Sequence, residues 1–139
     1  SKPAPRVGSK QVQGKRDFSQ PVQKLSERLA GMLIRRPKLL NVLSTEDREA
    51  FVALRNESDL LCKVEIIVSQ DPDLLTEELL SRWPDAEDMD RLVAMANVEE
   101  VLEKQEQEIQ FLEGVSRWLD LREENAEMEK LKQRINDGA

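Results

Sequence analysis

The sequence predicts an all-α protein: an irregular bundle of about six helices followed by one long projecting helix. Apolar residues recur at helical spacing from residue 21 onward. The segments between them are short and rich in Pro, Asp and Ser, as in turns between packed helices. Residues 98–136 contain no proline and one glycine, so we expect a single helix about 58 Å long there. Residues 21–97 would form a globule only about 29 Å across, so about half of the helix would project.

The first predicted helix covers residues 21–35. Pro21 is tolerated in a first turn, and Pro37 would end the helix because a residue before proline avoids helical backbone angles. A short helix over residues 37–42 would follow, and Ser44 and Thr45 would cap the next helix. The expected buried residues are Val22, Leu25, Leu29 and Leu33 in the first helix, and Phe51, Leu54 and Ala50 in the third.

Residues 57–69 are apolar over so wide an arc that we expect the central, most enclosed helix there. Residues 64–68 favour a strand by composition, but no second strand exists to pair with them. Residues 71–73 would form a turn, and Thr76 would cap a helix over residues 77–83. Asp85 would cap the sixth helix, up to residue 97, with an inward face of Leu92, Val93, Met95 and Ala96.

The long helix carries two apolar stripes whose centres differ by roughly 200° on a helical wheel at about 100° per residue. A dimeric coiled coil would hold one phase, so we expect two different packing partners. The second stripe could meet a returning helix, a second copy of the chain or another protein, and a break near Glu124 with Asn125 as cap is an alternative. We expect the first stripe to face the bundle (Val98, Val101, Leu102, Ile109, Leu112 and Leu119) and the second to face away (Phe111, Trp118, Leu121, Met128, Leu131 and Ile135).

Composition argues against catalysis. The 139 residues include no histidine, no tyrosine and one cysteine, so the commonest general base is missing and we expect no zinc or disulfide site. We therefore expect neither enzyme activity nor a cofactor in this domain. Residues 1–20 carry a net charge of +4 and residues 98–139 a net charge of −6, which argues against strong nucleic-acid binding by the folded part. We interpret residues 1–20 as a flexible basic linker, residues 21–97 as the bundle and residues 98–139 as the long helix.

Other features have ordinary structural explanations. Cys62 lies within an apolar helix and is expected to be a buried small hydrophobe, and Trp83 is expected in the core or at its rim. The acids Asp85, Glu87, Asp88 and Asp90 fit a helix start better than a metal site. No apolar run reaches membrane-spanning length and no signal peptide is evident, so we expect a cytoplasmic protein. The chain begins without methionine, which suggests a piece of a larger protein.

Three segments together resemble the C-terminal helicase-binding domain of bacterial DNA primase. They are Leu29-Ala30-Gly31-Met32-Leu33-Ile34-Arg35-Arg36-Pro37-Lys38-Leu39-Leu40, Asp73-Leu74-Leu75-Thr76-Glu77-Glu78-Leu79-Leu80, and Leu119-Asp120-Leu121-Arg122-Glu123-Glu124. The resemblance covers residues 21–139 and implies a bundle, then a long helix leading to a terminal helical hairpin that docks on the amino-terminal domains of the replicative helicase hexamer. The hairpin turn would correspond to residues 136–139, with its returning helix beyond them, and zinc and magnesium would belong to upstream domains.

The candidate helicase-binding residues are those of the second apolar stripe: Phe111, Trp118, Leu121, Met128, Leu131 and Ile135. The resemblance also implies a second partner. The acidic tail of single-stranded DNA-binding protein would contact Lys24, Arg28, Arg35 and Arg36, although Glu27 and Ala30 depart from the pattern. Two alternatives remain open: the helicase's own amino-terminal domain, and a homodimeric structural coiled-coil protein. The chain would be a monomer or a tail-swapped dimer.

Overall fold

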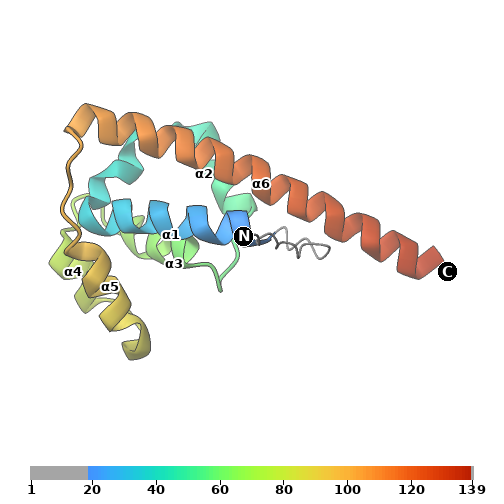
Figure 1. The fold of residues 1–139 in the computed structure, drawn as a ribbon, viewed down its shortest axis with the longest axis horizontal. Helices are drawn as coiled ribbons and strands as arrows, with labels where there is room; N and C mark the ends of the chain where they lie inside the picture. The colour runs from blue at the N-terminus through green and yellow to red at the C-terminus, as the bar shows by residue number, and fades with distance from the viewer. Residues whose placement is uncertain (1–18, 139) are drawn as a thin grey trace, which may run out of the picture.

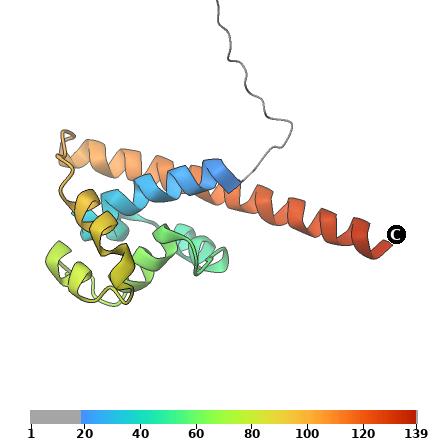
Figure 2. The ribbon, with the colours of Figure 1, turned by 60° about the horizontal axis from the view of Figure 1, so that its bottom comes forward.

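The computed structural model describes residues 19–138, and these residues are all-helical (Figure 1). They form six α-helices and two 3₁₀ helices, with no strand within that range. The predicted fold class is therefore confirmed. The long α6 (Lys104–Gly138) runs along one side of the molecule, and its second half extends beyond the other helices in both views (Figures 1 and 2).

Helix α1 (Ser19–Arg35) is the helix around which the others assemble. It packs against α3 (Leu60–Val68), α5 (Met89–Ala96) and the first half of α6. Leu29, Leu33 and Ile34 of α1 have no solvent exposure. The helix ends as predicted, because Pro37 begins the 3₁₀ helix η2 (Pro37–Val42) directly after it. The predicted linker lies outside the described residues except for Ser19 and Gln20, which begin α1.

Short polar caps start the next two helices. Ser44 precedes α2 (Thr45–Ala53) and its hydroxyl accepts a hydrogen bond from the Asp47 amide at 3.1 Å, which confirms the predicted cap. Asp59 caps α3 and accepts from the Leu61 amide at 2.8 Å. All of α3 except Lys63 and Ile66 is buried. The strand-prone residues 64–68 are helical, and α3 is as enclosed as predicted, although α1 is the centre of the bundle.

The next part of the chain differs in detail from the prediction. Helix α4 (Thr76–Ser81) already includes Thr76, whose hydroxyl donates to the Ile34 carbonyl of α1 at 2.7 Å instead of capping. The helix ends at Ser81 and Trp83 follows it, buried as expected. The predicted sixth helix is divided into η3 (Ala86–Asp88) and α5. Leu92 of α5 is fully buried, but Val93 is 39% exposed, so its predicted inward position is wrong.

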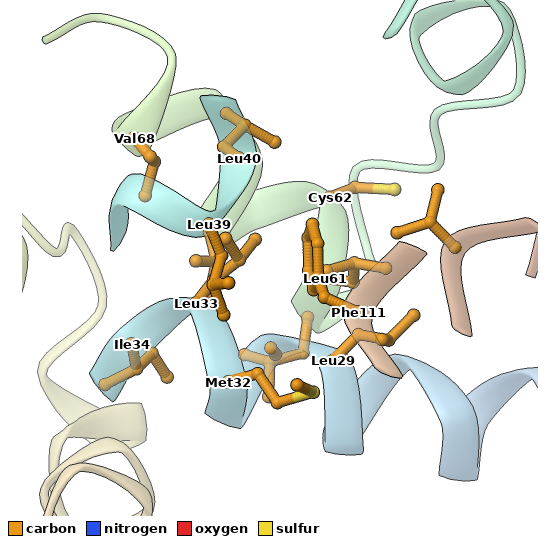
Figure 3. Close-up of a cluster of buried hydrophobic side chains, with 14 of the residues drawn as sticks. Leu29, Met32, Leu33, Ile34, Leu39, Leu40, Leu61, Cys62, Val68 and Phe111 are labelled. Carbon is orange, nitrogen blue, oxygen red and sulfur yellow. The ribbon is translucent and has the colours of Figure 1, made fainter. Parts of the chain in front are cut away.

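The core lies where α1, α3 and α6 meet. Figure 3 shows side chains of α1, η2 and α3 in one cluster, with Phe111 of α6 reaching into it. Phe111 is 1% exposed and Leu61 of α3 is also 1% exposed. The first half of α6 is therefore part of the same hydrophobic core as the preceding bundle.

The long helix begins later than predicted, at Lys104. Residues 98–103 instead form a non-helical connection from α5 to α6 (Figure 1). The connection is held by polar contacts: Arg35 pairs with Glu100 at 3.6 Å, and the Gln107 side chain donates to the Leu102 carbonyl at 2.8 Å. Helix propensity is overridden here because the chain must cross from one side of α1 to the other.

Helix α6 is continuous through Glu124 and Asn125, so the alternative with a break at this point is wrong. Its 35 residues correspond to about 52 Å. Every residue from 127 to 137 is exposed. We call residues 127–137 the distal arm, and residues 104–122 the proximal part of α6.

Candidate interaction surfaces on helix α6

The proximal part of α6 buries one face against the bundle. Phe111, Val115 and Trp118 follow one another at helical spacing and are no more than 1% exposed. Gly114 lies on the same face, where a Cβ atom would come within 2.5 Å of Leu29 Cδ2. The glycine therefore allows α1 and α6 to approach closely.

Trp118 connects α6 directly to α1 and α2 and, through Ser26, to the start of α3. Its ring stacks on Phe51 of α2, with centroids 4.5 Å apart and planes at 25°. Its Nε1 donates to Ser26 Oγ of α1 at 2.7 Å, and Ser26 Oγ donates in turn to Asp59 Oδ2 at 2.7 Å. Asp59 is the residue that caps α3, so a chain of hydrogen bonds runs from α6 through α1 to the start of α3. The Arg122 guanidinium lies 5.8 Å from the Trp118 ring centroid.

The prediction that Phe111 and Trp118 lie on an exposed docking face is wrong, because both side chains are in the core. The sequence did contain a signal for the true buried face: Gln107, Phe111, Gly114 and Trp118 recur at intervals of three and four. Glycine and glutamine are not counted as apolar on a helical wheel. The large aliphatic residues therefore decided which face was predicted to be buried. The Gln107 side chain can be buried because its polar atoms have partners. Its amide donates to the Leu102 carbonyl, and its oxygen accepts from Arg36 at 3.5 Å.

The stripe expected to face the bundle is largely in solvent, with the exception of Leu119, which is 7% exposed. The prediction that these residues face the bundle is wrong for Val98 (54% exposed), Val101 (82%), Ile109 (43%) and Leu112 (37%). Leu102 is partly buried. Val98, Val101 and Leu102 lie on the connection before α6 and not on the helix, so the helical wheel did not apply to them.

The distal arm carries the exposed remainder of the second stripe. Met128, Leu131 and Ile135 are 38%, 48% and 66% exposed. Their spacing of three and four places them on one side of the helix, in the arrangement by which helices pack on helical partners. Leu121, which precedes the arm, is partly buried against the core. Of the six predicted docking residues, the structure leaves these three exposed together.

The charges of the distal arm balance. It contains three acids, Glu127, Glu129 and Asp137, and three bases, Lys130, Lys132 and Arg134, so its net charge is zero. The six charged side chains are exposed. Association through the arm would therefore depend on the apolar stripe and on local pairing more than on long-range attraction.

The four residues of the predicted basic site fall into two groups: Arg35 and Arg36 are ion-paired within the chain, whereas Lys24 and Arg28 are exposed. Arg35 donates to the Met95 carbonyl at 3.1 Å in addition to its pair with Glu100. Arg36 pairs with Glu108 at 3.0 Å and donates to the Lys104 carbonyl at 3.3 Å. Arg36 therefore holds the start of α6 near the end of α1, whereas Arg35 holds the end of α5 and the connection there. Lys24 and Arg28 are exposed, and Arg28 donates to the Gln110 side chain at 3.1 Å.

The remaining chemical features are structural. Cys62 is fully buried and accepts a hydrogen bond from the Asn56 amide at 3.4 Å, and burial raises the pKa of its thiol to about 11. Lys63 contacts Asp85 and Asp88 at 3.5 and 3.8 Å, and Asp88 accepts from Trp83 Nε1 at 3.0 Å. Within residues 19–138, no three His, Cys, Asp or Glu side chains are arranged to hold a metal ion.

Comparison of the chain with protein-family models, curated proteins and solved structures gave no match. None of the helices between residues 19 and 138 combines the length and apolar character that crossing a membrane requires.

Proposed function

We propose that the chain is a protein-interaction domain that presents the distal arm of α6 to a helical partner. The observation that carries the proposal is the exposed stripe of Met128, Leu131 and Ile135 on a helix that extends beyond the bundle. Exposed apolar side chains that line one side of a projecting helix are typical of a docking surface. The buried proximal part would act as a rigid mount for that arm.

The proposed partner is the amino-terminal domain of the bacterial replicative helicase. This assignment is supported by the resemblance of residues 21–139 to the helicase-binding domain of DNA primase. An all-helical bundle followed by a long helix suits that layout. The domain would then hold primase at the replication fork and influence primer synthesis, while catalysis and its metals belong to other domains of the parent protein.

The size of the stripe suggests that one arm binds weakly. Fully burying an apolar side chain contributes about 1.5–3 kcal/mol, so three contribute roughly 5–9 kcal/mol before association costs. Those costs amount to about 4–15 kcal/mol. A ring of identical helicase domains would compensate, because several copies of the domain can act on one hexamer.

The test is a titration of the whole chain against a purified helicase amino-terminal domain by calorimetry. A variant with Met128→Ser, Leu131→Ser and Ile135→Ser should lose at least about tenfold in affinity, which corresponds to about 1.4 kcal/mol. The matched control carries Ile109→Ser and Leu112→Ser, two exposed apolar positions on the same helix. Wild-type affinity in the triple variant would contradict the proposal.

The second candidate function is a homodimer that forms through the same stripe, and the spacing of the residues supports it. Met128 and Ile135 are seven residues apart with Leu131 between them, which is heptad spacing, and Glu127 lies five residues before Lys132, where charges pair across a parallel coiled coil. Sedimentation at increasing concentration separates the two ideas, because a monomer throughout the range argues against this dimer.

We restrict the proposed contact with the acidic tail of single-stranded DNA-binding protein to Lys24 and Arg28, because Arg35 and Arg36 already form ion pairs with Glu100 and Glu108. Charge reversal at Lys24 and Arg28 should then weaken binding of a synthetic acidic tail peptide.

A further inference from the structure

A second apolar surface, separate from the distal arm, lies where the chain enters α6. We call it the corner patch, and its apolar residues are Val101, Leu102 and Ile109. A hollow of about 420 Å³ opens in it between the connection and the first turns of α6. The side chains that line the hollow are Val101, Leu102, Glu103, Gln105, Glu106 and Ile109. Its size suits an apolar side chain with its neighbours.

The chain segment that forms the corner patch is acidic, and Glu103 and Glu106 line the hollow itself. Residues 98–113 contain six glutamates and one base, Lys104. Two of the six, Glu100 and Glu108, are paired with Arg35 and Arg36. The other four are exposed and form no ion pair with another described residue: Glu99, Glu103, Glu106 and Glu113. The patch therefore favours a segment that combines apolar and basic side chains.

We propose that the occupant is the chain's own amino-terminal segment, residues 1–18. Five bases and one acid give this segment a net charge of +4, opposite to that of the patch. Val7 lies between Arg6 and Lys10, so one apolar side chain is flanked by bases. This pattern matches a hollow that is lined by Val101, Leu102 and Ile109 together with Glu103 and Glu106.

The segment is long enough to reach the patch. Helices α1 and α6 run antiparallel, because Ser26, in the first half of α1, contacts Trp118, whereas Arg36, directly after α1, contacts Lys104 at the start of α6. The start of α1 is therefore about 25 Å from the corner, the length of 17 helical residues. Eight extended residues span about 26 Å. Residues 11–18 can cover that distance and leave residues 1–10, including Val7, at the patch.

Because residues 1–18 belong to the same chain as the corner patch, a weak contact is sufficient for them to occupy it part of the time. A short tether gives an effective concentration on the order of millimolar. An interaction with a dissociation constant on the order of millimolar would then occupy about half of the molecules. Such a contact would be reversible and sensitive to salt.

The experiment uses the full chain with Ser9→Cys carrying a nitroxide label. Native Cys62 should remain unlabelled, because it is fully buried and its thiol pKa is raised to about 11. The readout is paramagnetic broadening of methyl resonances. At low salt, the Val101 and Ile109 methyl signals should lose about half of their intensity relative to those of Leu131 and Ile135. High salt should remove the difference.

The distal arm is a stringent internal reference, because α1 begins closer to it than to the corner (Figures 1 and 2). A segment without preference would broaden Leu131 and Ile135 at least as strongly as Ile109, and that result would overturn the proposal. Arg6→Glu combined with Lys10→Glu should abolish the preferential broadening. Ile109→Ser should weaken that of Val101, whereas Leu131→Ser, a matched exposed position, should not.

A mixture of labelled chains and separately isotope-labelled chains distinguishes attachment within one molecule from exchange between two. Broadening at the corner patch in that mixture would mean that a second copy supplies the segment, and it would also overturn the proposal. This test does not depend on the proposed function, because helicase binding is read on the distal arm.

Discussion

At the scale of single residues, Trp118 contributes most visibly to the packing of α6. It is fully buried, stacks on Phe51 and donates a hydrogen bond to Ser26. We predict that Trp118→Ala lowers the free energy of unfolding by about 3–5 kcal/mol, because it removes a large core side chain and leaves a cavity. Urea denaturation followed by circular dichroism measures the loss.

Trp118→Phe separates packing from hydrogen bonding in the same measurement, because it retains an aromatic ring but not the donor to Ser26. It should cost less than Trp118→Ala. Ile135→Ala provides the exposed control on the same helix and should change stability by no more than about 0.5 kcal/mol. Equal effects of Trp118→Ala and Ile135→Ala would contradict the assignment of the buried face.

Cys62 gives a prediction for pH. The pKa of its thiol is about 11 in the folded chain, compared with the ordinary value of 9.0, which we take for the unfolded chain. Below pH 9 the thiol is protonated in both states, so it adds no pH dependence. As pH rises from about 9 to about 11, the unfolded thiol ionises first and the folded state loses stability. The difference in unfolding free energy between wild type and Cys62→Ala, followed across this range, should change in that direction. A constant difference would argue against the buried thiol.

At the scale of helices, the close contact between α1 and α6 depends on Gly114. We predict that Gly114→Ala destabilises the protein by about 1–2 kcal/mol, although alanine favours helix. The new Cβ would lie 2.5 Å from Leu29 Cδ2, and Leu29 is fully buried and not free to move. Thermal unfolding measures the change.

Gly31→Ala is the matched control for Gly114→Ala. There the nearest atom is the end of the Arg35 side chain at 3.2 Å, so stability should stay constant or rise by up to about 1 kcal/mol. Combining Gly114→Ala with Leu29→Ala should cost less than the sum of the single changes. A Gly114→Ala protein as stable as wild type would mean that the helices can separate without loss.

The same scale shows what the sequence could predict. Helix boundaries set by Pro37, Ser44 and the turn at residues 71–73 are local, so the sequence predicted them closely. The orientation of α6 is not local, because it depends on which face fits α1. A small residue at Gly114 and a buried Gln107 decided that fit, and neither counts as apolar. The exposed stripe from Met128 to Ile135 was predictable because no other helix within residues 19–138 covers it.

At the scale of the whole molecule, α6 belongs to two environments. Its proximal part shares the core with α1 and α3, while residues 127–137 are exposed throughout. A rigid helix that continues from a core into solvent holds its exposed stripe at a fixed position relative to the bundle. This arrangement is the physical basis of the proposed docking function.

Amide hydrogen exchange along α6, measured with and without a helicase amino-terminal domain, tests this account most directly. In the free chain, we predict slow exchange at buried positions of residues 104–122 and much faster exchange in residues 127–137, because only the former require unfolding of the core. Adding the helicase domain should protect residues 127–137 selectively. Unchanged exchange in residues 127–137, or new protection confined to another helix, would contradict the assignment of the distal arm as the docking surface.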